Sequence, residues 1–133
     1  IKFVVMLDGD DAGEMAAGAM LRFGAQKNRH FFQLERPDFK DKGGKSWDVE
    51  IEDMLPWPLL EAYIARYPEA AEEHYQRGGV HKVIIQGKPV HRDGQVFDYK
   101  MMLTEFVKQR ATAEDMTAMV TLLRKARTCM GLK

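Results

Sequence analysis

The sequence predicts an α/β domain with a parallel-sheet core of Rossmann-like character, and three observations lead to that prediction. Residues 3–7 form an apolar run rich in β-branched and aromatic side chains, which is the composition of a buried strand. An acidic turn follows, and then residues 14–27 carry the small apolar residues of a helix that lies close on a sheet. Residues 30–34 have the pattern of a second strand, and a right-handed crossover would place it parallel to the first.

The acidic turn is the candidate for chemistry. Asp8 and Asp10 stand at the carboxyl end of the first predicted strand, where open α/β sheets place their ligand sites. Gly9 allows a tight turn between them, and Gly13 allows the helix to start close to the sheet. Two neighbouring carboxylates repel each other unless a cation lies between them, and magnesium prefers such oxygen ligands. Without further context, a solvated acidic turn is the commoner outcome of an Asp-x-Asp pattern.

Two other kinds of acidic loop fit the turn less well. An EF-hand would need oxygen donors at positions 12 and 19, and both residues are alanine. A phosphatase of the aspartyl-phosphate type would carry a threonine in the turn, where this sequence continues with Asp11. The EF-hand is therefore excluded, and the phosphatase is a minor alternative.

Composition sets the outer limits of the prediction. The chain has 133 residues, which is the size of a single domain. Basic and acidic residues number 20 each, so net charge argues neither for nor against a nucleic-acid partner. The single cysteine, Cys129, excludes an intrachain disulfide and a cysteine-based zinc site. Because the sequence has no long apolar run and no signal peptide, we expect a cytoplasmic protein without a membrane partner.

Two charged segments follow the predicted β-α-β unit. The first, at 35–45, is a loop by its proline and its paired glycines, and its Lys40, Lys42 and Lys45 would suit a phosphate backbone. A solvated loop is the simpler interpretation of those lysines. The second is the acidic pair Glu52-Asp53, for which the residues alone favour helix capping by Asp53.

The rest of the chain adds helices and a hairpin to this core. Two helical segments are expected first, at 59–67 and 69–77, with Pro68 at the break between them. A short strand at 80–86, a hairpin around an Asp-Gly turn, and finally two helices are expected to follow. The methionines of the last helix are expected to fill a core. The predicted organisation of the single domain is a β-α-β core with the acidic motifs at 1–55, a helical insertion at 56–79, and the hairpin with the C-terminal helices at 80–133.

The stretch from Leu7 to Ala17 reads Leu-Asp-Gly-Asp-x-Ala-Gly-x-x-Ala-Ala, and it resembles the second acidic motif of the TOPRIM domain. That metal-dependent module is shared by topoisomerases, bacterial primases and nucleases of the OLD (overcoming lysogenisation defect) family. The segment Ile51-Glu-Asp-Met-Leu-Pro56 is similar to one in the OLD nucleases, where an acidic residue joins the metal site. The resemblance therefore makes Glu52 a metal ligand, with Asp53 as its substitute.

The OLD nucleases also carry a lysine at the start of a late helix, which reaches their two-metal centre. Lys100 is the position that fits best, and Lys88 and Lys82 are the reserves. By this resemblance, Lys100 would neutralise charge that builds up on the scissile phosphate or on its leaving oxygen.

The resemblance implies a metal-dependent DNA endonuclease, a hydrolase of phosphodiester bonds, with a role of the phage-defence kind. Two ions of Mg²⁺ or Mn²⁺ would be held by Asp8, Asp10 and Glu52. TOPRIM domains carry an earlier strand ending in a catalytic Glu, and that strand would precede Ile1. We therefore expect a TOPRIM core that is incomplete at its N-terminus, in a segment of a longer protein with an upstream ATPase domain as partner.

Two alternatives remain open at the level of the sequence. One is nucleotidyl transfer of the primase or topoisomerase type. The other is a non-catalytic TOPRIM-like module that binds nucleic acid or a partner protein. The sequence is also compatible with a homo-oligomer.

Overall fold

The computed structural model describes residues 3–132, and the chain divides into two compact units. The first comprises residues 1–54 and 117–133, and the second comprises residues 55–116. The sequence predicts a single domain. Within the described residues there are four α-helices and three two-stranded sheets, so the mixed α/β class is confirmed. None of the helices in residues 3–132 has the length and the apolar run that are needed to cross a membrane.

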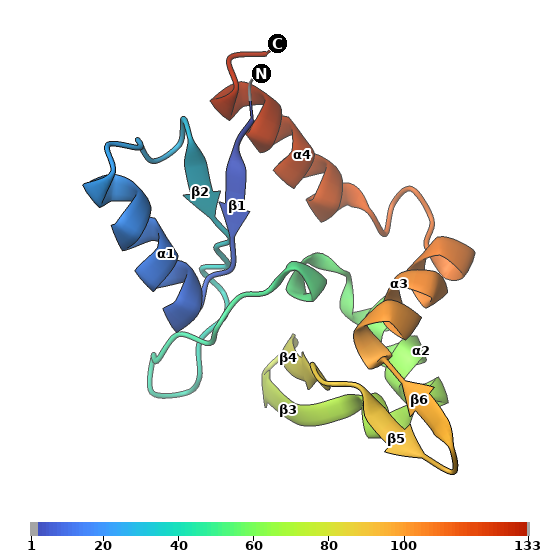
Figure 1. Ribbon diagram of the computed structural model, residues 1–133. Helices are drawn as coiled ribbons and strands as arrows, with labels where there is room; N and C mark the ends of the chain where they lie inside the picture. Colours follow the sequence, from blue (N-terminus) through green and yellow to red (C-terminus); the bar gives the residue numbers. More distant parts are fainter. Residues whose placement is uncertain (1–2, 133) are drawn as a thin grey trace. The chain divides into compact units, whose positions relative to one another are not determined.

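The first unit begins with the predicted β-α-β arrangement, formed by β1 (Val5–Leu7), α1 (Asp11–Arg22) and β2 (Phe31–Gln33) (Figure 1). The two strands are parallel, and the register places Val5 opposite Phe31 and Leu7 opposite Gln33. Phe31 and Phe32 are fully buried, so β2 supplies the centre of this core. The parallel pair is compatible with a TOPRIM core, and the TOPRIM fold itself stays a prediction.

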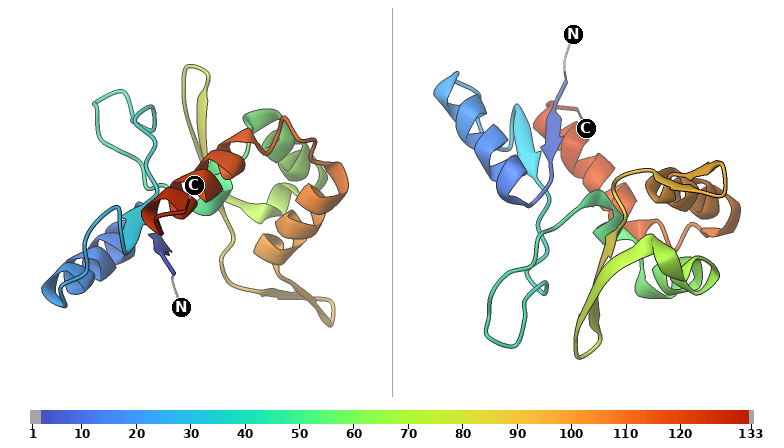
Figure 2. Two further views of the ribbon diagram at one scale, coloured as in Figure 1. Left: turned by 90° about the horizontal axis from the view of Figure 1, so that it is seen from above. Right: turned by 60° about the horizontal axis from the view of Figure 1, so that its bottom comes forward.

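A loop of residues 35–47 extends away from β2 before the chain reaches the 3-10 helix η1 (Ile51–Met54) (Figure 2). At its base the Phe39 ring is buried and meets the Trp47 ring edge-on, with 5.5 Å between the ring centroids. Near its tip the Asp41 side chain accepts a hydrogen bond of 2.9 Å from the Lys45 amide. The loop is therefore closed on an aromatic pair and on a local turn.

The last helix, α4 (Thr117–Cys129), completes the first unit, whereas the hairpin with which the sequence groups it lies in the second unit. None of the described residues of α4 is buried, and Leu123 is 66% exposed. The expectation that its methionines fill a core is therefore wrong for the described chain. Helical spacing identifies an apolar face, but it does not say whether another element covers that face.

The second unit contains α2 (Trp57–Arg66), the 3-10 helix η2 (Pro68–Ala70), β3 (Ala71–Arg77), β4 (Val80–Ile85), β5 (Val90–Arg92), β6 (Gln95–Phe97) and α3 (Tyr99–Arg110). Tyr63 of α2 lies at the centre of its core and is fully buried. The Tyr63 hydroxyl donates a hydrogen bond of 2.6 Å to the Tyr99 carbonyl, and its ring packs edge-on against Phe106. Apolar side chains from α2, η2, β4 and α3 fill the rest: Leu59, Leu60, Ala70, Val83, Ile85 and Leu103.

The predicted helix at 69–77 is wrong, because residues 71–77 form strand β3. Their composition favours a helix, but the turn at Gly78, with φ of 60°, folds β3 back onto β4 in an antiparallel pair. The buried residues of β4 then hold the pair in place, so tertiary packing overrides local propensity. The predicted insertion at 56–79 is helical only in its first part. The hairpin of β5 and β6 around the Asp93-Gly94 turn is confirmed.

Candidate metal site at the acidic turn

The turn that follows β1 is fixed by a two-hydrogen-bond bridge to a distant segment. The Gly9 amide donates to the Val49 carbonyl at 2.7 Å, and the Val49 amide donates to the Gly9 carbonyl at 2.9 Å. A Cβ atom at Gly9 would overlap the Leu34 carbonyl oxygen and lie 3.1 Å from the Val49 Cβ, so only glycine fits. The bridge therefore holds Val49, where the segment leading to Glu52 begins, directly beside the acidic turn. This turn lies at the carboxyl ends of β1 and β2.

Asp10 is the N-cap of α1. Its backbone is extended, and its Oδ1 accepts a hydrogen bond of 2.7 Å from the Gly13 amide. A Cβ atom at Gly13 would overlap the carbonyl oxygen of Asp8. The predicted close approach at Gly13 is thus confirmed. Because a carboxylate has two oxygens, Asp10 can cap the helix with one and offer the other to a cation.

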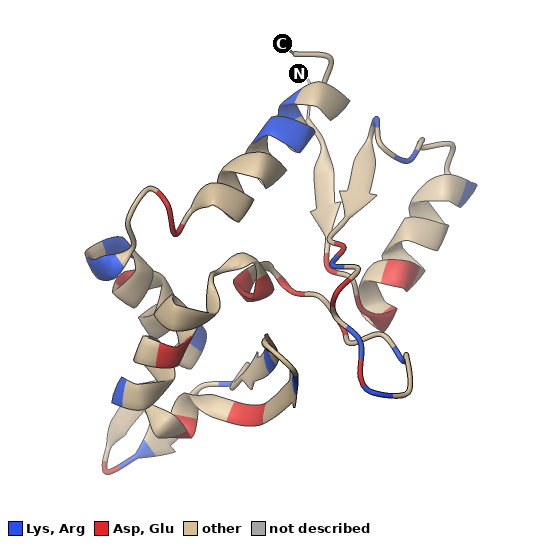
Figure 3. Ribbon diagram, turned by 180° about the vertical axis from the view of Figure 1, so that it is seen from behind, with Lys and Arg blue, Asp and Glu red and all other residues tan. Residues whose placement is uncertain are grey.

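The surroundings of the turn are acidic. Asp8 is exposed and Asp10 is half-buried, while Asp11 and Glu14 occupy the first turn of α1. Figure 3 shows this concentration of acidic residues at the start of α1. Four carboxylates within seven residues create a local negative potential that attracts cations.

The second acidic segment is buried. Within the 3-10 helix η1, Glu52 is 6% exposed and Asp53 is 3% exposed. The Asp53 Oδ2 accepts a hydrogen bond of 2.8 Å from the Glu50 amide, so this side chain stabilises its own short turn. α2 starts later, after Pro56. The expectation that Asp53 caps α2 is therefore wrong, because Asp53 lies within η1 and Pro56 occupies the N-cap position of α2.

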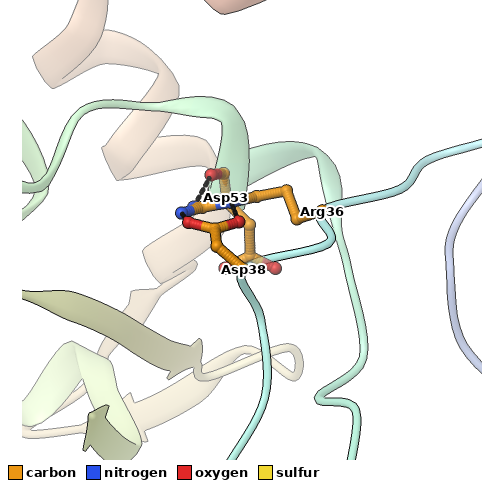
Figure 4. Close-up of polar contacts among 3 residues, drawn as sticks. All are labelled: Arg36, Asp38 and Asp53. Carbon is orange, nitrogen blue, oxygen red and sulfur yellow. Dashed lines mark hydrogen bonds and ion pairs between the residues drawn. The ribbon is translucent and has the colours of Figure 1, made fainter. Parts of the chain in front are cut away.

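Arg36 anchors this segment to the loop that follows β2, and Figure 4 shows the contacts. Its Nη1 donates a hydrogen bond of 2.8 Å to the Asp53 carbonyl, and its Nε and Nη2 bind the two carboxylate oxygens of Asp38. The guanidinium also lies 3.9 Å from the centroid of the Phe39 ring. Sequence reasoning missed Arg36, and the only signal for it was its place two residues before an aspartate in a loop after a buried strand.

The carboxylate oxygens of the turn suit a hard divalent ion. However, the three predicted ligands Asp8, Asp10 and Glu52 do not come together around a common point. Within residues 3–132, no three His, Cys, Asp or Glu side chains gather closely enough to hold a metal. The bridge between Gly9 and Val49 thus brings the segments of Asp8, Asp10 and Glu52 together without joining their carboxylates in a three-ligand cage. Magnesium is commonly held by one or two carboxylates, with water and substrate phosphates as its other ligands. Asp8 and Asp10 match that open kind of site.

The predicted basic residues are distributed over both units. Lys40, Lys42 and Lys45 are exposed on the 35–47 loop of the first unit, where basic and acidic residues alternate (Figure 3). Lys100 is exposed at the second position of α3, and the Asp98 side chain caps that helix. Lys82 lies in β4 and is 2% exposed, and Lys88 follows β4. Because Lys100 and both reserves belong to the second unit, their assignment to the metal site stays a prediction.

Comparisons with protein-family models, with curated proteins and with solved structures found no match to this chain. The TOPRIM and OLD resemblance therefore rests on the two motifs at Leu7–Ala17 and Ile51–Pro56. It enters the functional argument as a hypothesis, beside the geometry of the acidic turn.

Proposed function

We propose that this chain is the catalytic segment of a metal-dependent DNA endonuclease of the OLD TOPRIM kind. The observation that carries the proposal is the bridge between Gly9 and Val49. It places the Asp8-Gly9-Asp10 turn and the start of the segment leading to Glu52 at the same edge of a parallel strand pair. That edge is where α/β folds assemble ligand sites, and both segments carry the acidic motifs of the resemblance.

In this proposal, Asp8 and Asp10 hold a Mg²⁺ or Mn²⁺ ion at the end of β1. Divalent ions in such a site stabilise the attacking and leaving oxygens of phosphodiester hydrolysis. The exposed lysines of the 35–47 loop would bind backbone phosphates on either side of the cleaved bond. Lys100 would stabilise the charge that develops on the leaving oxygen.

Of the two buried acids in η1, Glu52 is the more suitable candidate metal ligand, although its carboxylate does not form a three-ligand group with Asp8 and Asp10. One carboxylate oxygen of Asp53 already accepts the Glu50 amide, and the Asp53 carbonyl is bound by Arg36. Those contacts stabilise the η1 turn. Glu52 is buried in the same turn, and a buried carboxylate retains its charge most readily beside a positive ion.

The test is nicking of a supercoiled plasmid by the full-length protein with Mg²⁺ or Mn²⁺. Asp8→Asn and Asp10→Asn remove charge from the turn, and Asp10→Asn is preferable to alanine because asparagine caps a helix equally well. Asp11→Asn is the matched control, since Asp11 is an exposed neighbour in the first turn of α1. We expect the first two variants to lose cleavage by at least about 100-fold and the control to retain it.

Two results would contradict the proposal. Wild-type protein that is folded and binds DNA but cleaves under neither metal would favour the non-catalytic module. Equal cleavage by the Asp8→Asn and Asp11→Asn proteins would show that the Asp8 carboxylate takes no part in the reaction. Lys100→Met tests the lysine separately, with loss of cleavage and unchanged DNA binding as the expected result.

A further inference from the structure

Two histidines and a tryptophan form a cluster in the second unit that the nuclease proposal does not use. His74 lies on β3 and His81 on β4, and the antiparallel register places them diagonally across the hairpin. His74 Nε2 and His81 Nδ1 are 2.9 Å apart. The Trp57 ring, at the start of α2, stacks on the His81 ring at 3.8 Å with an interplanar angle of 3°.

We propose that His74 and His81 form a binding site for a divalent transition-metal ion of the nickel or copper type. Imidazole nitrogen is a preferred ligand of these metals, whereas magnesium prefers oxygen. The site therefore differs in chemistry from the acidic turn, and it also lies in the other unit.

The separation of the two nitrogens supports this class of metal. Two ligand nitrogens that lie about 2.0–2.1 Å from an ion and subtend a right angle at it are about 2.9 Å apart. Right angles are typical of the square-planar and tetragonal sites of Cu²⁺ and Ni²⁺. A tetrahedral zinc site would separate the same nitrogens by about 3.3–3.4 Å. The observed distance therefore equals the nitrogen separation that right-angled coordination requires.

The ion would take the place of the proton between the two rings. In the hydrogen-bonded pair, one neutral imidazole donates its N–H to the other. On metal binding that proton moves, through water, to the outer nitrogen of the same ring. Both rings then remain neutral with one N–H each, and both inner nitrogens offer a lone pair to the ion. No net proton is gained or lost.

Local packing favours an open site with one well-oriented ligand. Stacking against Trp57 fixes the plane of the His81 ring, and His74 is exposed at the surface of the hairpin. No third His, Cys, Asp or Glu completes a metal-binding group with the pair in the described part of the chain. Water would therefore fill the remaining positions around the ion.

Trp57 provides the readout, because a paramagnetic or heavy ion bound to His81 would quench the fluorescence of the stacked indole. The chain has two tryptophans, so a Trp47→Phe background leaves Trp57 as the sole reporter. We expect Cu²⁺ and Ni²⁺ to quench it saturably with one equivalent and EDTA to restore it, while Mg²⁺ has no effect. His74→Gln and His81→Gln should each raise the metal concentration for half-quenching by at least about tenfold.

His91→Gln is the matched control, since His91 is an exposed histidine on β5 outside the cluster, and it should bind metal as the parent does. Far-UV circular dichroism checks that each variant is folded, and exposed His74 is the safer of the two substitutions. Unchanged quenching in His74→Gln would place the ion elsewhere and overturn the proposal. Absence of quenching by both metals in the folded parent would also overturn it. Neither result depends on whether the protein cleaves DNA.

Discussion

Gly13→Ala is the sharpest test of how the acidic turn is built. A Cβ atom at this position would overlap the Asp8 carbonyl oxygen and lie 2.9 Å from the Asp8 carbonyl carbon, well inside an ordinary contact. Both atoms are backbone, so no side-chain rotation relieves the clash. Overpacking of this kind costs about 1–3 kcal/mol or more, and the better helix propensity of alanine returns about 1 kcal/mol. Because a clash with backbone lies at the upper end of that range, we expect a net loss of about 2 kcal/mol.

Gly18→Ala is the matched control in the same helix. The nearest atom to a Cβ there is Nη1 of the Arg22 side chain at 3.6 Å, which is an ordinary contact with a flexible group. Alanine should therefore stabilise α1 by about 0.5–1 kcal/mol. One glycine-to-alanine change is thus expected to destabilise the first unit, and the other is expected to stabilise it.

The assay is urea unfolding followed by Trp47 fluorescence in a Trp57→Phe background. Trp47 belongs to the first unit, so it reports on that unit even where the two units unfold in separate steps. Equal midpoints for the Gly13→Ala and Gly18→Ala proteins would refute the reasoning, because α1 could not then start against the Asp8 carbonyl. A destabilised Gly13→Ala protein should also lose nicking activity, since both carboxylates of the turn must move.

Two further predictions test the cores of the units. Tyr63→Phe should lower the unfolding free energy of the second unit by about 1 kcal/mol at neutral pH, because the buried hydrogen bond from the Tyr63 hydroxyl to the Tyr99 carbonyl is lost. Burial raises the pKa of Tyr63 above its usual value of 10, so only the unfolded chain loses that proton as pH rises past 10. Wild-type stability should therefore fall there and the deficit of the variant should shrink, and a constant deficit would contradict this account. Arg36→Lys keeps the charge but loses the Nη1 donor to the Asp53 carbonyl and the guanidinium fork on the Asp38 carboxylate, and should cost the first unit about 1.5–3 kcal/mol. The exposed Arg29→Lys is its control, and similar losses in both would contradict the anchoring role of Arg36.

Local sequence signals predicted the first unit's central feature. The apolar run before Asp8 and the glycines at 9 and 13 act within a few residues of one another, so the strand, the turn and the helix start could be derived without knowing the tertiary structure. The Asp93-Gly94 hairpin was predictable for the same reason, because positive φ angles at both residues favour this residue pair. In each case a backbone requirement selects the residue type directly.

Features that depend on distant partners were not predictable in this way. Residues 71–77 favour a helix by composition, and only pairing with β4 makes them a strand. Once that pairing is known, His74 and His81 become neighbours across the turn at Gly78, although their spacing in the sequence matches no metal-binding pattern. The contact of Arg36 with the Asp53 carbonyl likewise joins segments 17 residues apart.

The acidic turn holds its shape through contacts that need no ion. The Gly9 bridge fixes one side of it, and the hydrogen bond from the Gly13 amide fixes the Asp10 side chain. Asparagine at position 10 would accept the same bond, so Asp10→Asn changes the charge of the turn while its geometry persists. Alanine would remove the charge and the helix cap together. A loss of cleavage in that variant could then come either from the missing metal ligand or from fraying of α1. A loss of cleavage in the asparagine variant therefore reports on charge at the end of β1, which is the property that the nuclease hypothesis requires.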